Sequence, residues 1–142
     1  IVQSKDYVVI LQEMMHDARI IPLTDMPHAP EAIELLHGDS RGYWDGDTLV
    51  VETRNFSDRS EHSHNRAELN VERITRIGDG QLRYQLTSND PGTYSAPYTR
   101  EIIFDYSDGD IYEFACHEGN YALPNMLQGA REEERREAAG EN

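Results

Sequence analysis

Apolar and polar residues alternate along much of the chain with a period of two, which is typical of β-strands that bury one face. The clearest alternating segments are residues 82–87, 102–106 and 111–116. Residues 7–11 form a continuous apolar run, as in a strand covered on both faces. This pattern predicts a mainly β fold.

Three Asp-Gly pairs separate strand-like runs, at Asp45-Gly46, Asp79-Gly80 and Asp108-Gly109. Because Asp-Gly supplies the positive φ angles of a two-residue turn, each pair predicts the tip of an antiparallel hairpin. Successive hairpins predict a meander that closes into a barrel or half-open barrel of about eight strands.

Two helices are expected beside these strands. Pro30 suits the first position of a short helix near residues 30–37. From about Asn125, apolar residues recur at helical spacing and predict a C-terminal helix that packs outside the barrel. Residues 131–142 are charged, have no apolar face to bury and are expected to fray, which leaves residues 1–130 as one β-barrel-like domain.

The length and the net charge of the chain limit the number of domains and the kinds of partner that we expect. A chain of 142 residues is expected to form one domain. With 27 acidic and 13 basic residues, its net charge of −14 argues against binding to nucleic acid or to anionic membranes. No apolar run is long enough for membrane insertion, and the lone Cys116 cannot form an internal disulfide. The chain begins at Ile1 without a methionine, so we expect that it was processed or belongs to a longer protein.

The sharpest candidate for chemistry is the segment from Cys116 to Tyr121, which directly follows a predicted strand. His117 is a candidate general base and Glu118 a candidate acid that orients it. Neighbouring residues of a strand point to opposite faces, so both reach one pocket only if the chain turns at Gly119. The alternative is a structural corner that places Cys116 in the core.

A second candidate is the group of His16, Asp17 and Arg19. His16 and Asp17 suit an acid/base pair, and Arg19 suits a clamp for a carboxylate or phosphate. The alternative is structural: Asp17 caps a turn, and Arg19 forms an ion pair with Glu13 or Glu52.

A weaker metal hypothesis rests on His62, His64 and Glu68, whose spacing matches the inner part of the first cupin metal motif. Phe56 and Thr75 replace the flanking glycines of that motif. A solvated loop is therefore favoured over a site for a divalent metal, and no cofactor is predicted.

Several aromatic and basic residues are candidates for contacts with a ligand inside a barrel. Aromatic rings with a polar atom line cavities and still form hydrogen bonds, and an arginine among inward positions can anchor an anion. The alternatives are ordinary core packing and ion pairs across the sheet. The predicted ligand-binding residues are Arg19, Trp44, Arg73, Tyr84, Tyr112 and Tyr121.

Three segments carry a resemblance to a known family: residues 15–23 (MHDARIIPL), 38–53 (GDSRGYWDGDTLVVET) and 112–121 (YEFACHEGNY). Together they resemble a family of uncharacterised bacterial proteins, many of them exported. The resemblance implies a β-rich fold and a periplasmic or extracellular location, and it implies no reaction.

Three hypotheses for function follow. The first is a lipocalin-like exported domain that binds a small, partly apolar molecule. The second is an enzyme on the same scaffold, a hydrolase, lyase or isomerase, with His117 as base, Arg19 as anion clamp, and Glu118 or Asp17 as orienting acid. The third is a structural protein that assembles into homo-oligomers.

Overall fold

Eight strands precede one α-helix in the part of the chain that the structure describes. This computed structural model describes residues 1–59, 68–115 and 118–140. The strands all lie in one compact unit, Ile1–Ile111, and the helix lies in a second, Tyr112–Asn142. All the strand pairs within the two sheets are antiparallel, so the prediction of a mainly β fold is confirmed.

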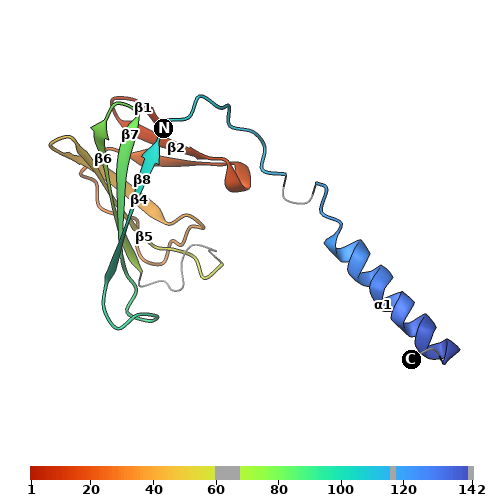
Figure 1. The fold of residues 1–142 in the computed structure, drawn as a ribbon. Helices are drawn as coiled ribbons and strands as arrows, with labels where there is room; N and C mark the ends of the chain where they lie inside the picture. The colour runs from red at the N-terminus through yellow and green to blue at the C-terminus, as the bar shows by residue number, and fades with distance from the viewer. Residues whose placement is uncertain (60–67, 116–117, 141–142) are drawn as a thin grey trace. The chain divides into compact units, whose positions relative to one another are not determined.

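The first unit begins with a three-stranded sheet. Its strands are β1 (Val2–Gln3), β2 (Tyr7–Gln12) and β3 (Asp17–Pro22), paired in that order. A single 3₁₀ turn, η1 (Met14–His16), connects β2 to β3. The paired β2 and β3 form the hairpin drawn in red in Figure 1.

The rest of this unit is a five-stranded sheet whose spatial order is the order of the chain, as expected for a meander. Its strands are β4 (Asp39–Asp45), β5 (Thr48–Arg54), β6 (Leu69–Gly78), β7 (Gln81–Asn89) and β8 (Tyr98–Asp105). In Figure 1 the β2–β3 hairpin lies across one end of this sheet.

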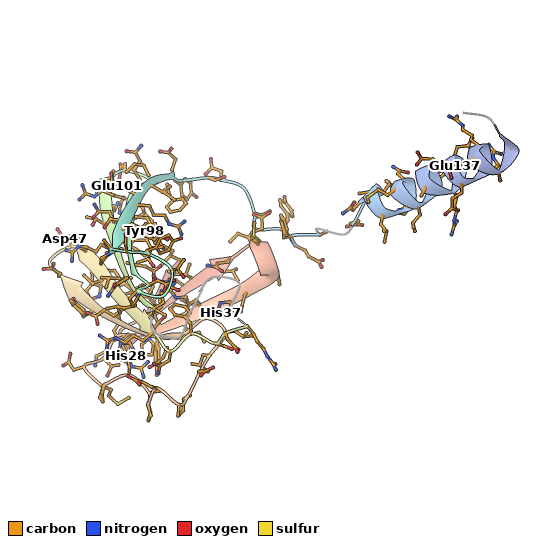
Figure 2. All side chains as sticks on the ribbon, turned by 90° about the horizontal axis from the view of Figure 1, so that it is seen from below. His28, His37, Asp47, Tyr98, Glu101 and Glu137 are labelled. Carbon is orange, nitrogen blue, oxygen red and sulfur yellow. The ribbon has the colours of Figure 1, made fainter. Side chains whose placement is uncertain are left out.

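Two of the three predicted hairpin turns are confirmed. Asp45 pairs with Thr48, so Gly46 and Asp47 form the loop between β4 and β5, and Figure 2 shows Asp47 at the tip. Gly46 has a φ of 58°, and Gly80 in the β6–β7 turn has a φ of 73°. Both glycines adopt the left-handed backbone that such turns require.

The third predicted hairpin is wrong, because β8 ends at Asp105 and residues 111–115 form no strand. The Tyr106 N–H donates to the Gly80 carbonyl at 2.6 Å, which holds the end of β8 against the β6–β7 turn. The Ser107 hydroxyl then accepts the Gly109 N–H at 3.3 Å and closes a local turn. These bonds replace the two-residue loop that the Asp-Gly pair predicted.

The pairing of β6 with β7 contains a β-bulge. Gly78 pairs with Gln81 at the turn, but the register shifts by one between Gly78 and Arg76. Beyond the shift, Glu72 lies opposite Leu86. Side chains of paired residues lie on the same face of a sheet. The one-residue shift therefore places Glu72, rather than Arg73, on the face that carries Leu86.

The two sheets meet at a close contact between Leu23 and Gly42, which form an isolated parallel bridge. A Cβ atom built on Gly42 would lie 2.9 Å from Ile21 Cγ2 and 3.0 Å from Leu23 Cδ2, so only glycine fits without displacement. Buried residues from both sheets form one core: Val8, Ile21, Leu49, Val51 and Ile74.

The short helix predicted near residues 30–37 is wrong, because that segment forms turns. Leu35 uses its backbone for a bridge to the chain after β5 instead: its N–H donates to Asn55 O at 3.0 Å, and its carbonyl accepts the Ser57 N–H at 2.9 Å. A helix this short is marginal by itself, so these bonds to the chain after β5 decide the conformation.

The second unit contains α1 (Ala122–Ala139), which confirms the predicted C-terminal helix. The helix is capped by Gly140, whose φ is 71° and whose N–H donates to the carbonyls of Arg136 and Glu137. It continues through residue 131, where the charged tail was predicted to begin. Among the described residues, no helix is both long and apolar enough to cross a membrane.

Candidate functional site

A cavity of about 700 Å³ lies in the first unit, between the β2–β3 hairpin and the inner face of the large sheet. Its volume falls within the range of roughly 300–1,000 Å³ that small-molecule sites occupy. The residues that form its wall include Ile10, Arg19, Thr53, Phe56, Asn70, Glu72, Ile74, Leu82, Tyr84, Leu86, Ser88, Tyr98, Arg100, Ile102 and Phe104.

The strand register divides this wall into a polar half and an apolar half. Residues that lie opposite one another on neighbouring strands form rows across the sheet, and side chains of one row share a face. The polar rows are Thr53–Asn70–Ser88–Tyr98 and Val51–Glu72–Leu86–Arg100. The apolar rows are Leu49–Ile74–Tyr84–Ile102 and Leu82–Phe104.

An ion pair between the two sheets lies at the boundary between these halves. Arg19 of β3 donates through both terminal nitrogens to Glu72 of β6, with Nη1 3.0 Å from Oε1. The Tyr84 hydroxyl donates to the same oxygen of Glu72 at 2.8 Å. Arg19 Nη2 also lies 3.5 Å from Thr53 Oγ1, which contacts the Ser40 hydroxyl at 2.9 Å. Both carboxylate oxygens of Glu72 are therefore occupied.

The pKa of Tyr84 is raised above its ordinary value of 10.0, first because burial disfavours the phenolate and second because Glu72 lies beside it. The ring of Tyr84 packs edge-on against that of Phe104, with 5.9 Å between the centroids. Tyr84 thus stays protonated at neutral pH and serves as a hydrogen-bond donor between the polar and apolar halves of the wall.

Two buried polar atoms of the wall have no hydrogen-bond partner among the described residues: Arg19 Nε and Asn70 Oδ1. Buried polar groups are paired in the great majority of cases, so each such atom needs an explanation. One atom is a donor and the other an acceptor, and both belong to residues of the polar half.

Comparisons with other proteins suggest no function for this cavity. A scan against models of protein families, a search of curated proteins and a search of solved structures each find no match. Function must therefore be argued from the cavity itself.

One edge of the cavity carries a contact between a histidine and a carboxylate. His37 Nε2 lies 2.5 Å from Asp17 Oδ2, and His37 is one of the residues that line the cavity. Figure 2 shows His37 beside the β2–β3 hairpin, and Tyr98 on β8. The rings of Tyr94 and Tyr98, which also line the cavity, pack edge-on with centroids 4.9 Å apart.

A separate polar cluster surrounds Asp39 at the start of β4. Its carboxylate accepts the Ala29 N–H at 2.8 Å, contacts His28 Nδ1 at 3.1 Å and pairs with Arg41 at 2.5 Å. Burial alone would raise the pKa of Asp39, but these donors together hold it below the ordinary value. Asn55 Nδ2 donates to Ala29 O at 2.8 Å, so the cluster fastens the segment before β4 to the sheet.

The residues predicted for catalysis do not form one described group. His117 lies outside the described residues, and Glu118 is exposed in the second unit. His16 is exposed at the end of η1, with a φ of 49°. Asp17 shares a face of β3 with Arg19, but its carboxylate contacts His37 rather than His16. The strand begins at Asp17, so the predicted turn pair is wrong.

Among the predicted ligand-binding residues, Arg19 and Tyr84 line the cavity. Arg73 does not: its Nη2 lies 2.7 Å from Asp45 Oδ2 on the opposite face of the sheet. The β-bulge explains this correction, because a regular hairpin would have placed Arg73 opposite Leu86.

Of the three remaining ligand candidates, Trp44 is not among the residues of the cavity wall, and the other two belong to the second unit. Trp44 is 46 % exposed near the β4–β5 turn and does not plug the cavity. Tyr112 and Tyr121 are exposed residues of the second unit. The aromatic count of the sequence does not distinguish these surface rings from Tyr84, because burial depends on the pairing of strands.

The metal candidates His62 and His64 lie outside the described residues. Glu68 is buried and accepts a hydrogen bond from Ser88 at 3.0 Å. The part of the chain that the structure describes contains no group of three His, Cys, Asp or Glu side chains that could hold a metal ion.

The polar and charged cavity residues that were not selected as ligand contacts from the sequence include Thr53, Glu72 and Arg100. The usable signal was the spacing of two between Arg100, Ile102 and Phe104, which places a cation on the apolar face of β8. Glu72 likewise lies two residues before Ile74, but Val71 and Ile74 fall on opposite faces of β6, so the apolar residues alone do not identify its inner face.

Proposed function

We propose that this protein binds a small, partly apolar molecule in the cavity of its β-unit, as a lipocalin-like binding module. The observation that carries the proposal is a cavity of about 700 Å³ whose wall is divided into one apolar and one polar half. Small-molecule sites combine such an apolar surface with a few placed polar groups.

The shape of the fold supports the same proposal. The β2–β3 hairpin covers the inner face of the large sheet through the Arg19–Glu72 pair, and the two sheets share one core. We propose that together they act as a half-open barrel, whose interior is the binding site. The resemblance to exported proteins makes the periplasm or the cell exterior the proposed location.

An enzyme on the same scaffold is less well supported. A general base needs a free proton-accepting atom within reach of a substrate. Glu72 has both oxygens occupied by Arg19 and Tyr84, and the Asp39 carboxylate is filled by Ala29, His28 and Arg41. Both carboxylates are engaged in hydrogen bonds and ion pairs that stabilise the fold, so neither offers a free oxygen to act as a general base.

The proposal is tested with the uncharged fluorescent probe N-phenyl-1-naphthylamine and two matched variants of β8. Ile102 lines the cavity, whereas Ile103 is the next residue and points to the other face, and the two are similarly exposed, at 41 % and 43 %. We expect the protein to bind the probe saturably, Ile102→Trp to weaken binding by occupying part of the apolar half of the cavity, and Ile103→Trp to leave binding unchanged.

The Ile103→Trp control distinguishes binding in the cavity from non-specific binding to the protein surface. If both tryptophan variants bind as the unmodified protein does, or both lose binding equally, the probe does not occupy the cavity and the proposal is wrong. Thermal unfolding of both variants verifies that they are folded.

A further inference from the structure

Arg100 is the one side chain that brings an uncompensated positive charge to the described cavity wall. It lies on β8 in the same row as Glu72 and Leu86, but Leu86 separates it from Glu72 by a full strand. Arg100 is exposed and lies at the open side of the cavity, and among the described residues its side chain forms no ion pair and no hydrogen bond.

The other charged groups of the wall are already matched. Arg19 and Glu72 neutralise each other, and His37 pairs with Asp17. Glu68 is 5 % exposed, accepts a hydrogen bond from Ser88 and has a further interaction. Among the charged side chains of the described wall, Arg100 is therefore the one whose positive charge a ligand would encounter, and the α-amino group of Ile1, a residue that is 64 % exposed, is a second positive group at the cavity.

The apolar surface begins directly beside this charge. Ile102 and Phe104 follow Arg100 at spacings of two on the same strand, so all three side chains share the inner face. Residues two apart on a strand are about 7 Å apart, which is the reach of a short alkyl or aryl segment. Ile74 and Leu82 extend the apolar surface across the neighbouring strands.

We infer that the ligand is an amphipathic monocarboxylate, whose carboxylate pairs with Arg100 and whose apolar body lies over Ile102 and Phe104. This inference rests on the proposed function, since it assigns the chemistry of a molecule in the same cavity. Arginine binds carboxylates through two parallel hydrogen bonds, which fixes the orientation of the ligand as well as its charge.

The net charge of −14 does not oppose this assignment. Exposed charges are largely screened beyond about 8 Å at physiological ionic strength, so a carboxylate in direct contact with Arg100 interacts mainly with that arginine and little with distant acidic residues. The negative surface acts on the rate of encounter rather than on the contacts in the bound state.

The experiment measures how three probes with the same alkyl chain displace N-phenyl-1-naphthylamine: decanoate, decanol and decylammonium. A charge-assisted hydrogen-bond pair corresponds to about a tenfold difference in affinity. We expect decanoate to bind about tenfold more tightly than decanol, and decylammonium to bind most weakly.

Two variants assign the preference to its residue. Arg100→Gln should bring decanoate to the affinity of decanol while leaving decanol unchanged, and Arg100→Lys should keep part of the preference. The matched control is Arg54→Gln, which removes one positive charge from a 50 % exposed arginine near Glu52 and should leave the order unchanged.

The outcomes separate the inference from the function on which it rests. If the fluorescent probe binds but decanoate and decanol compete equally, or decylammonium competes best, the cavity binds molecules and the carboxylate assignment is overturned. Equal loss of the preference in Arg100→Gln and Arg54→Gln also overturns it, because the effect is then one of net charge. If the fluorescent probe does not bind at all, the proposed function fails together with the inference.

Discussion

At the scale of single residues, Glu72 is the group on which the inner wall depends. Its side chain is 6 % exposed and accepts hydrogen bonds from Arg19 and Tyr84. Glu72→Gln would leave the Arg19 charge without its partner in a largely buried position, which costs about 3 kcal/mol. We expect urea denaturation to show a fall of that size in the free energy of unfolding.

The control for Glu72 lies on the neighbouring strand. Glu52 is an acid of β5 that lies 3.8 Å from Arg54, and these side chains are 34 % and 50 % exposed, far more than that of Glu72. Glu52→Gln should change the free energy of unfolding by less than about 1 kcal/mol. Equal losses in the two variants would show that the Arg19–Glu72 pair behaves as a surface pair.

Tyr84 gives the protein a dependence on alkaline pH. Its pKa is raised from 10.0 by burial and by Glu72, so the folded state holds the phenolic proton more tightly than the unfolded state does. This contribution to stability is complete below pH 10.0 and is lost as the pH rises above that value towards the folded pKa.

The measurement is the free energy of unfolding over a pH series that crosses 10.0, for the unmodified protein and for Tyr84→Phe. We expect the loss of stability at high pH to be smaller in the variant. Tyr43→Phe, at a ring that is 47 % exposed on β4, should keep the full alkaline loss. An unchanged alkaline loss in Tyr84→Phe would contradict the raised pKa.

The sequence identified some of these residues because their signals are local. Arg19 shares a face of β3 with Ile21, and Tyr84 lies within a regular alternation, so both were named as ligand contacts and both line the cavity. Arg73 was chosen where Glu72 is the inward residue, because the bulge near Arg76 reverses the faces of β6. One inserted residue cannot be inferred from a pattern with a period of two.

At the scale of elements, the contact between the two sheets depends on the absence of a side chain at Gly42. An added Cβ would approach Ile21 and Leu23 to 2.9 and 3.0 Å, and both neighbours belong to the junction. Gly42→Ala should therefore lower the free energy of unfolding by about 2 kcal/mol through overpacking.

The matched control for this prediction is Gly78→Ala at the end of β6. There the nearest atom to an added Cβ is Gln81 Oε1 at 3.6 Å, an ordinary contact. We expect urea denaturation to show a change within about 1 kcal/mol for this variant. A Gly42→Ala protein as stable as the control would show that the hairpin can move away from the sheet without loss.

The elements that the sequence predicted correctly are those fixed by neighbouring residues. Gly46 and Gly80 specify turns whose strands adjoin them, and the two hairpins formed as expected. The helix near residues 30–37 and the strand after Gly109 failed for a different reason. Leu35 and Tyr106 donate their backbone N–H groups to Asn55 and Gly80, which are distant in the sequence. Such partners do not appear in a local pattern.

At the scale of the whole molecule, two kinds of electrostatic interaction oppose each other. The Arg19–Glu72 and Asp39–Arg41 pairs are largely buried and attract at short range. The excess of 27 acidic over 13 basic residues repels at long range. Salt screens interactions between exposed charges far more than those between buried pairs, so added salt should act mainly on the repulsion.

We therefore expect the melting temperature of the β-unit to rise by roughly a few degrees as sodium chloride increases from about 10 mM to about 150 mM, because the screening length falls from about 30 Å to about 8 Å. Circular dichroism of the strands during heating provides the measurement. Choline chloride at the same concentrations should give the same rise, since screening does not depend on the identity of the cation.

Arg73→Gln, which removes a surface pair with Asp45, should preserve the rise of the melting temperature with salt. A melting temperature that falls with salt would mean that accessible pairs such as Arg73–Asp45, rather than the buried ones, dominate the electrostatic free energy of this fold.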